Sequence, residues 1–189
     1  MLHSDETWSK SSARDDGEMH LRQSWEGPLL EATLPGGETV VVRPLQADDE
    51  PALRVGFAEL SPATRYHRFH AHVAALTEAQ WRYLTQIDGD RHVALVALIG
   101  ERLVGVVRLI QLPDDADAAE VAFIVADEMQ GRRLGTIMRD AVFAIARARA
   151  YRRLYAYVLP DNRAIRRLLA VDDAVCVDRG TVLELVFSA

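Results

Sequence analysis

The sequence predicts an α+β domain (a mixed α/β fold) built on one sheet that helices cover on both faces. Residues 92–112 form two apolar runs around the turn Gly100-Glu101, which indicates an antiparallel hairpin. Residues 136–150 place apolar side chains at helical spacing. Strand-like apolar runs lie on both sides of that helix, so strands and helices belong to one layered unit.

The length of 189 residues suits a single domain. Residues 1–27 are polar and show no apolar period, which predicts an N-terminal tail that is flexible or docked on the body. The domain itself is expected over residues 28–189. The hydrophobic fraction of the whole sequence, 49%, is that of an ordinary globular protein.

Charge and hydropathy exclude several classes of protein. The net charge of −6 argues against bulk binding of nucleic acid. No apolar run approaches the ~20 residues that cross a bilayer, and the first residues lack the pattern of a secretory signal. We therefore expect a cytoplasmic bacterial protein with neither nucleic acid nor membrane as a partner. The single cysteine, Cys176, lies in an apolar run and is expected to be a buried structural thiol.

In the first half of the chain, the turn Pro35-Gly36-Gly37 predicts a hairpin over residues 29–45. Three helices are expected next, because Asp48, Ser61 and Thr77 are of the types that cap a helix start. These helices are predicted over residues 49–60, 62–69 and 78–87.

In the second half, the acidic stretch 113–118 is expected to be a loop, and a strand is expected to start near Ala119. After the helix at 136–150, a strand over 152–159 leads to Pro160-Asp161-Asn162, which is a helix-start pattern. Two short strands joined at Arg179-Gly180 close the chain.

The segment from Gln130 to Thr136 lies between a strand and a helix. The first amides of a helix have no partner within it, and the helix dipole adds partial positive charge there. Glycines let a ligand approach the backbone, and Arg132 and Arg133 add full charges. The segment predicts an anion site, although a tight turn that binds nothing is also compatible with it. It is neither a P-loop nor a dinucleotide fingerprint.

Gln130-x-x-Arg133-x-Gly135 resembles the Q/R-x-x-G-x-G/A motif of the GNAT superfamily of acyl-CoA-dependent N-acyltransferases. The stretch TVVVRPL resembles the first strand of that superfamily, and VLPDN, ending at Asn162, resembles its late strand and helix. Within the superfamily, LSPATRYHRFH and LTEAQWRYLTQIDGDRHVALVAL most resemble bacterial Pat-type protein lysine acetyltransferases.

This resemblance implies a mostly antiparallel twisted sheet of about seven strands, splayed between strands 4 and 5. It implies acetyl-CoA as co-substrate and no metal. The pyrophosphate would bind backbone amides of residues 131–136, and the pantetheine would lie along the backbone near Phe123. Arg133 departs from the motif, which has glycine there. The implied binding residues are Phe123, Ile124, Val125, Gln130, Gly131, Arg132, Arg133, Leu134, Gly135, Thr136 and Asn162.

Glu120 is the expected general base. A lysine amine, with a pKa of ~10.4, must lose a proton before it can attack a thioester. Apolar neighbours of Glu120 would raise its pKa, although a solvated strand-end carboxylate is the alternative. An amide of Phe123 or Ile124 would stabilise the oxyanion. The helix after Asn162 has no tyrosine, so no acid is assigned, and Tyr155 and Tyr157 are interpreted as packing residues.

The resemblance therefore implies an N-acetyltransferase that acts on a primary amine, in particular a protein lysine. An acyl-CoA synthetase is a candidate protein acceptor, and a homodimer is a possible assembly. Two alternatives stay open: a non-catalytic acyl-CoA sensor or interaction module, and an acetyltransferase for small amines or polyamines. His67, His70 and His72 lack metal-ligand spacing and are expected beside the acceptor channel.

Overall fold

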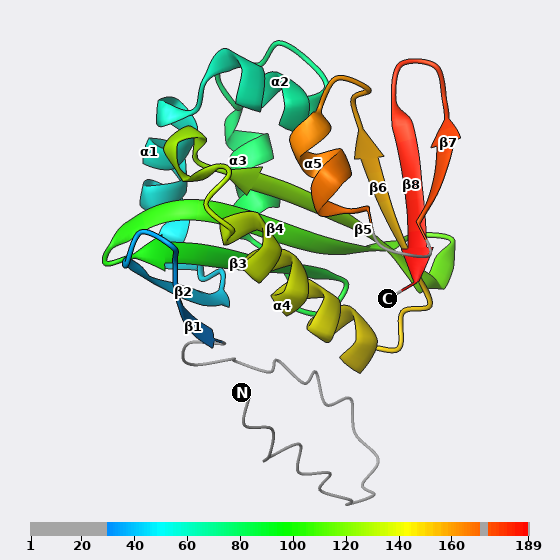
Figure 1. The fold of residues 1–189 in the computed structure, drawn as a ribbon, viewed down its shortest axis with the longest axis horizontal. Coiled ribbons are helices and arrows are strands. Elements are labelled where there is room, and N and C mark those ends of the chain that lie inside the picture. Colours follow the sequence, from blue (N-terminus) through cyan, green and yellow to red (C-terminus); the bar gives the residue numbers. More distant parts are fainter. Residues whose placement is uncertain (1–29, 171–173, 189) are drawn as a thin grey trace, which may run out of the picture.

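The computed structural model describes residues 30–170 and 174–188, so the predicted tail over residues 1–27 lies outside the described residues. Within the described part, eight strands form one sheet. They are β1 (Leu30–Thr33), β2 (Thr39–Pro44), β3 (His92–Ile99), β4 (Arg102–Leu112), β5 (Asp115–Val125), β6 (Arg153–Val158), β7 (Val175–Asp178) and β8 (Leu183–Ser188). Their spatial order is β1-β2-β3-β4-β5-β6-β8-β7 (Figure 1).

Helices cover both faces of this sheet (Figure 1). They are α1 (Glu50–Glu59), α2 (Pro62–Phe69), α3 (Glu78–Thr85), α4 (Leu134–Ala148) and α5 (Arg163–Leu168), with short 3-10 turns η1 (Ala47–Asp49) and η2 (Asp127–Met129). On one face, α4 packs its apolar side chains, among them Met138 and Val142, on residues such as Leu95 and Val107. On the other face, Leu53 of α1 and Trp81 of α3 pack on Val96. None of the described helices is long and apolar enough to span a membrane.

The predicted fold class is confirmed, because the sheet is mostly antiparallel and helices lie on both faces. The sheet has eight strands rather than about seven among the described residues. The loop predicted over residues 113–118 is wrong, since β5 already begins at Asp115. That acidic start of the strand is held by pairing with β4, and Arg153 forms an ion pair of 2.6 Å with Asp115.

Two of the three predicted helix caps form as expected. The Ser61 hydroxyl accepts from the Thr64 amide at 3.2 Å, and the Thr77 hydroxyl accepts from the Gln80 amide at 3.2 Å. The cap predicted at Asp48 is wrong. The position before α1 is Asp49, and its carboxylate instead accepts from both terminal nitrogens of Arg43, at 2.6 and 2.7 Å.

The burial predicted for Cys176 is also wrong, because its side chain is exposed. Its strand, β7, is the outermost strand of the sheet and pairs with β8. Val175 beside it is 60% exposed. The apolar residues of this strand therefore do not report a core position.

The feature that positions the functional site is the junction between β5 and β6. These strands run parallel and pair over three positions, Ala118 with Arg153, Ala119 with Leu154, and Glu120 with Tyr155. Beyond Glu120 they diverge, as Figure 1 shows. The second half of β5 therefore has β4 on one side and an open gap on the other.

Candidate active site

The gap between β5 and β6 is a cleft whose open space is about 970 Å³. Residues of α2, of the start of α4 and of α5 complete its walls. All of the site residues predicted from the sequence line the cleft except Arg132 and Leu134. Those that line it are Glu120, Phe123, Ile124, Val125, Gln130, Gly131, Arg133, Gly135, Thr136 and Asn162.

The side chains of Arg132 and Leu134 point elsewhere. The Arg132 guanidinium forms an ion pair with Glu38 and contacts the Met129 sulfur at 3.3 Å. Leu134 is fully buried in the core beneath α4. The positive charge expected from Arg132 in the cleft is therefore neutralised by Glu38. A role of its backbone amide stays a prediction.

The turn before α4 presents its backbone N–H groups without protein partners. Within the described chain, none of the amides of residues 131–136 donates a hydrogen bond to a protein acceptor. Arg133 occupies the position before α4, and no side chain caps that helix start. Because unpaired N–H groups at a helix start attract anions, this turn suits a diphosphate.

Arg133 holds the turn in a left-handed conformation, with φ of +69°. Glycine adopts this conformation freely, whereas a side chain makes it unfavourable by roughly 1–2 kcal/mol. The backbone geometry of the motif glycine is thus retained in spite of the arginine. Gly135 is required for another reason: a Cβ there would lie 3.3 Å from the Leu168 side chain, so its absence lets α4 and α5 approach each other.

Gln130 fastens the turn to the rest of the site. Its side-chain amide nitrogen, Nε2, donates to the Thr64 hydroxyl and to the Val125 carbonyl, each at 3.2 Å. Asp127 adds a second link, since its carboxylate accepts from the Ser61 amide at 2.8 Å and from the Thr64 hydroxyl at 2.6 Å. Helix α2 is therefore held at the open edge of β5.

Glu120 lies where the cleft begins, on the same face of β5 as Ala122 and Ile124. Its side chain is half-buried. Burial raises the pKa of the Glu120 carboxyl, and the nearby charge of Arg68 opposes part of this rise. The solvated alternative is not supported by this environment. A carboxylate with a raised pKa is suited to accept a proton near neutral pH.

The opposite wall, formed by β6 and the start of α5, contributes Tyr157 and Asn162. The sequence favours a packing role for Tyr157, but the residue lines the cleft and is 38% exposed. Burial raises the pKa of its hydroxyl, as do the charges of Glu184 and Glu120, so the hydroxyl keeps its proton. The alternation of side chains along β6 is the sequence signal that could have identified this residue. Ala156 and Val158 point into the core, so Tyr157 between them points to the opposite face.

Asn162 caps α5, and its side-chain oxygen accepts from the Ile165 amide at 3.2 Å. Because a capping oxygen leaves the amide nitrogen available, the same side chain has a donor to offer a ligand.

The three histidines go to different partners. His67 contacts Asp161 at 3.3 Å, so it connects α2 with the loop after β6. His70 bonds to the backbone of Tyr157, and His72 stacks on Tyr66 with ring centroids 4.8 Å apart. His67 and His70 line the cleft. Among the described residues, no group of three or more potential ligands is arranged for a metal ion.

Cationic side chains surround the end of the cleft near α4 and α5. Four arginines line it: Arg133, Arg139, Arg163 and Arg167. Arg166, by contrast, donates to the Pro160 carbonyl at 3.0 Å. Guanidinium groups are strong partners for phosphates, so charge and open amides favour the same type of ligand at this end.

Comparisons with known proteins identify the family of the chain. The sequence profile of the acetyltransferase (GNAT) family matches residues 57–170. An acetyltransferase of Pseudomonas aeruginosa is 32% identical over 147 residues, covering 76% of this chain and 78% of that protein. The acetyltransferase Pat of Mycolicibacterium smegmatis is 33% identical over 151 residues, covering 78% of this chain and 45% of Pat. The crystal structure of the GNAT domain of S. lividans PAT matches with a TM-score of 0.78 at 29% identity, over 85% of this chain and 96% of that one.

The family profile spans more than half of the chain, and this settles the class of protein: the chain belongs to the acetyltransferase (GNAT) family. It is an acetyl-CoA-dependent acetyltransferase, and its relatives include Pat-type acetyltransferases. The open amides, the arginines and the volume of the cleft fit a CoA thioester.

Proposed function

We propose that the protein transfers the acetyl group of acetyl-CoA to a primary amine, with a protein lysine side chain as the acceptor. One observation carries the proposal: the cleft has a half-buried carboxylate, Glu120, at its beginning and a turn with unpaired backbone amides, residues 131–136, along its wall. The likeness to the acetyltransferase Pat supports a protein acceptor. An acyl-CoA synthetase is the first acceptor to try.

In this proposal, the diphosphate of CoA binds the amides of residues 131–136. The pantetheine arm lies along the free edge of β5 from Phe123 to Val125, and the amide nitrogen of Asn162 donates to it from the other wall. The open edge of β5 supports this placement, since its backbone groups face the gap on that side.

Glu120 then accepts a proton from the ammonium group of the acceptor. The neutral nitrogen attacks the thioester carbonyl carbon, and the oxyanion that forms is stabilised by a backbone amide of Phe123 or Ile124. The C–S bond breaks, and the thiolate takes a proton from Tyr157. The second proton of the attacking nitrogen passes to the tyrosinate, and Glu120 releases its proton to solvent, so that the amide, free CoA and one proton are the products. The raised pKa values of Glu120 and Tyr157 support this division of roles, because one must be able to hold a proton and the other must arrive with one.

The test is to incubate the protein with acetyl-CoA and, separately, with an acyl-CoA synthetase, free lysine, small amines and polyamines, while measuring released thiol. We expect release that depends on the synthetase and acetyl-lysine in that protein by mass spectrometry. Release with polyamines alone would move the function to small amines. Tight binding of acetyl-CoA with no release on any acceptor would replace the enzyme with an acyl-CoA sensor.

A further inference from the structure

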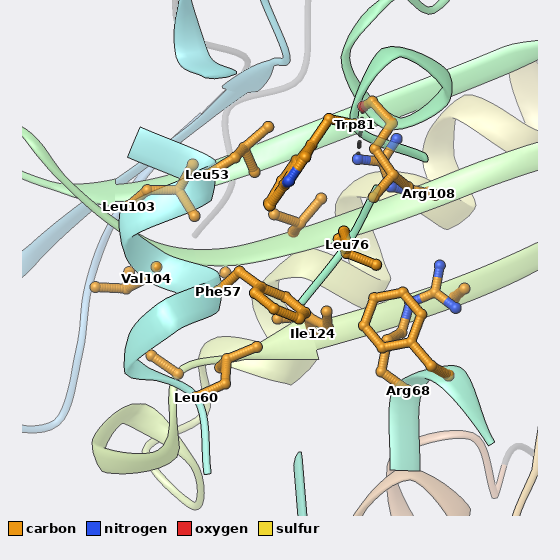
Figure 2. A pocket seen from close by; sticks show the side chains of 17 residues that line it. Leu53, Phe57, Leu60, Arg68, Leu76, Trp81, Leu103, Val104, Arg108 and Ile124 are labelled. Atoms are coloured by element: carbon orange, nitrogen blue, oxygen red, sulfur yellow. Dashed lines mark hydrogen bonds between the residues drawn. The ribbon is translucent and has the colours of Figure 1, made fainter. Parts of the chain in front are cut away.

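A second, smaller cavity lies between the sheet and α1, α2 and α3 (Figure 2). Its volume, measured as the space that the centre of a water molecule can occupy, is about 60 Å³. That is room for roughly four to six waters or for a short chain of non-hydrogen atoms. Its walls are mostly apolar and include Phe57, Leu76 and Trp81.

This cavity adjoins the acetyl-transfer cleft. Four residues line both spaces: Arg68, Phe69, Ala122 and Ile124. Ala122 and Ile124 follow Glu120 on the same face of β5, so the cavity lies beside the place proposed for the reacting carbonyl group. A group attached to either substrate can reach it from the cleft.

Two arginines, Arg68 and Arg108, lie at one end of the cavity (Figure 2). Arg108 is 4% exposed and donates to the Leu84 carbonyl at 2.8 Å and to the His92 ring at 3.1 Å. Both partners are uncharged at neutral pH, since burial, with the charge of Arg108, lowers the pKa of His92 to about 4.

Neither arginine forms an ion pair within the described chain. The two are close enough that the charge of Arg68 contributes to lowering the pKa of Arg108, after the larger effect of burial. Glu120 influences the pKa of Arg68 but lies beyond ion-pairing distance. Two neighbouring cations with no carboxylate between them are unfavourable in a buried place, and an anion there would relieve this.

We propose that this cavity is a subsite for a carboxylate carried by one of the two substrates. Arg68 and Arg108 bind the carboxylate, and its carbon chain lies against the apolar wall. The carboxylate is either the end of a short acyl chain, as in a succinyl group, or the α-carboxylate of an amino acid acceptor. The proposal rests on the transfer reaction proposed above and extends its substrates, because neither an acetyl group nor a lysine within a protein carries such a carboxylate.

The donor arm of the test measures dissociation constants by calorimetry for succinyl-CoA and butyryl-CoA, whose acyl groups have four carbons and differ in the terminal carboxylate. We expect succinyl-CoA to bind at least about tenfold tighter, as for a charged hydrogen bond. The acceptor arm titrates free lysine and lysine amide into protein saturated with CoA. If the carboxylate comes from the acceptor, free lysine binds about tenfold tighter and the two donors bind alike.

Three variants separate charge from folding, with the affinity for acetyl-CoA as the reference in each. Arg68→Gln should bring the preference for the carboxylate ligand close to onefold. Arg68→Lys keeps a positive charge and should retain part of the preference. Arg82→Gln on α3, which changes an exposed arginine outside the cavity, should leave the preference as in the wild type.

Equal affinities in both arms would overturn the proposal, and so would a preference that survives in Arg68→Gln. Thiol release from acetyl-CoA is measured on the same samples. A protein that transfers acetyl but shows no carboxylate preference keeps its proposed function and loses the subsite. A protein with the preference but without turnover keeps the subsite and loses the proposed function.

Discussion

Glu120 of β5 lies directly opposite Tyr155 of β6, in the last residue pair that joins the two strands. The main chain that carries this carboxyl group is thus paired on both sides, while the next residues of β5 face the open gap. The main chain of Glu120 is therefore held by the sheet at the place where the cleft begins. Its geometry does not depend on a loop.

Replacing this carboxylate should remove most of the activity. We expect Glu120→Gln to lower kcat by about 100-fold or more, which is typical for the loss of a general base. Binding of acetyl-CoA should change less than threefold, since the glutamine is similar in size. Thiol release and calorimetry measure the two quantities. Full activity in this variant would exclude Glu120 as the base.

The activity should also fall in acid, in a way that reports the same group. The folded pKa of Glu120 is raised above its ordinary value of 4.5, and only the ionised form accepts a proton. In the wild type, kcat/KM should therefore decline as pH falls through that raised pKa. The residual activity of Glu120→Gln should lack this decline. A pH profile of both proteins at constant ionic strength makes the comparison.

Tyr157→Phe tests the proposed acid. The hydroxyl has a raised pKa and lines the cleft, so its removal should lower kcat by about tenfold or more while KM for acetyl-CoA changes little. Tyr155→Phe, one step back on the same strand face, is the matched control. Equal effects of the two substitutions would mean that Tyr157 has no particular role in proton transfer.

At Arg133, a glycine substitution should leave the protein more stable than an alanine substitution, which is the reverse of the usual order in helices. Glycine normally lowers helix stability relative to alanine by about 0.5–1 kcal/mol. Here φ is +69°, so Arg133→Gly should be more stable than Arg133→Ala by about 1 kcal/mol in urea unfolding. Both substitutions remove the same charge, and their difference therefore reports the backbone. A more stable alanine variant would contradict the left-handed conformation.

Asn162 has a structural and a proposed binding role, which two substitutions can separate. Asn162→Asp keeps the oxygen that caps α5, so stability should stay within about 0.5 kcal/mol of the wild type. It loses the amide donor and should raise KM for acetyl-CoA severalfold. Asn162→Ala removes both and should also lower the free energy of unfolding by about 1 kcal/mol. Unchanged KM in both variants would limit Asn162 to its capping role.

The Arg43–Asp49 ion pair makes a prediction about acid stability. Burial alone would raise the pKa of Asp49, but hydrogen bonds from Arg43 and the Gln46 amide outweigh it and hold the pKa below its ordinary value of 3.8. The stabilisation is thus present above that value and is lost as pH falls through the folded pKa. Asp49→Asn should lower the free energy of unfolding by about 3 kcal/mol at pH 7, with a smaller difference below about pH 3.

Asp48→Asn is the control for that prediction, because Asp48 is exposed and forms no ion pair in the described part of the chain. It should change stability by less than about 0.5 kcal/mol. If both substitutions are equally mild at pH 7, the buried pair does not stabilise the fold as proposed.

The sequence correctly predicts those elements whose structure depends on neighbouring residues in the chain. The caps at Ser61 and Thr77 are such cases, and so is the hairpin turn at Gly100. Tertiary pairing decided the rest. Asp115 disfavours a strand by itself, yet β4 and Arg153 hold it in one. Cys176 is in an apolar run, but its strand lies at the sheet edge, which no local pattern reveals.

The same distinction applies to the site. The motif from Gln130 to Gly135 predicted the cleft wall, because a turn that opens a helix is a local structure. It could not show that Arg132 would pair with Glu38, which is distant in the sequence. Nor could it show that Arg68 and Arg108 meet in one cavity, since α2 and β4 supply them separately.

The junction of three residue pairs between β5 and β6 has a consequence for local opening of the sheet. One group of strands, β1 to β5, and another, β6 to β8, share few backbone bonds, so the seam between them should open before either group unfolds. A CoA molecule bound between the two groups of strands would stabilise the closed arrangement. When CoA is bound, hydrogen–deuterium exchange of the amides in β6 and in the second half of β5 should slow sharply. The exchange of β3 amides should stay as it is without CoA.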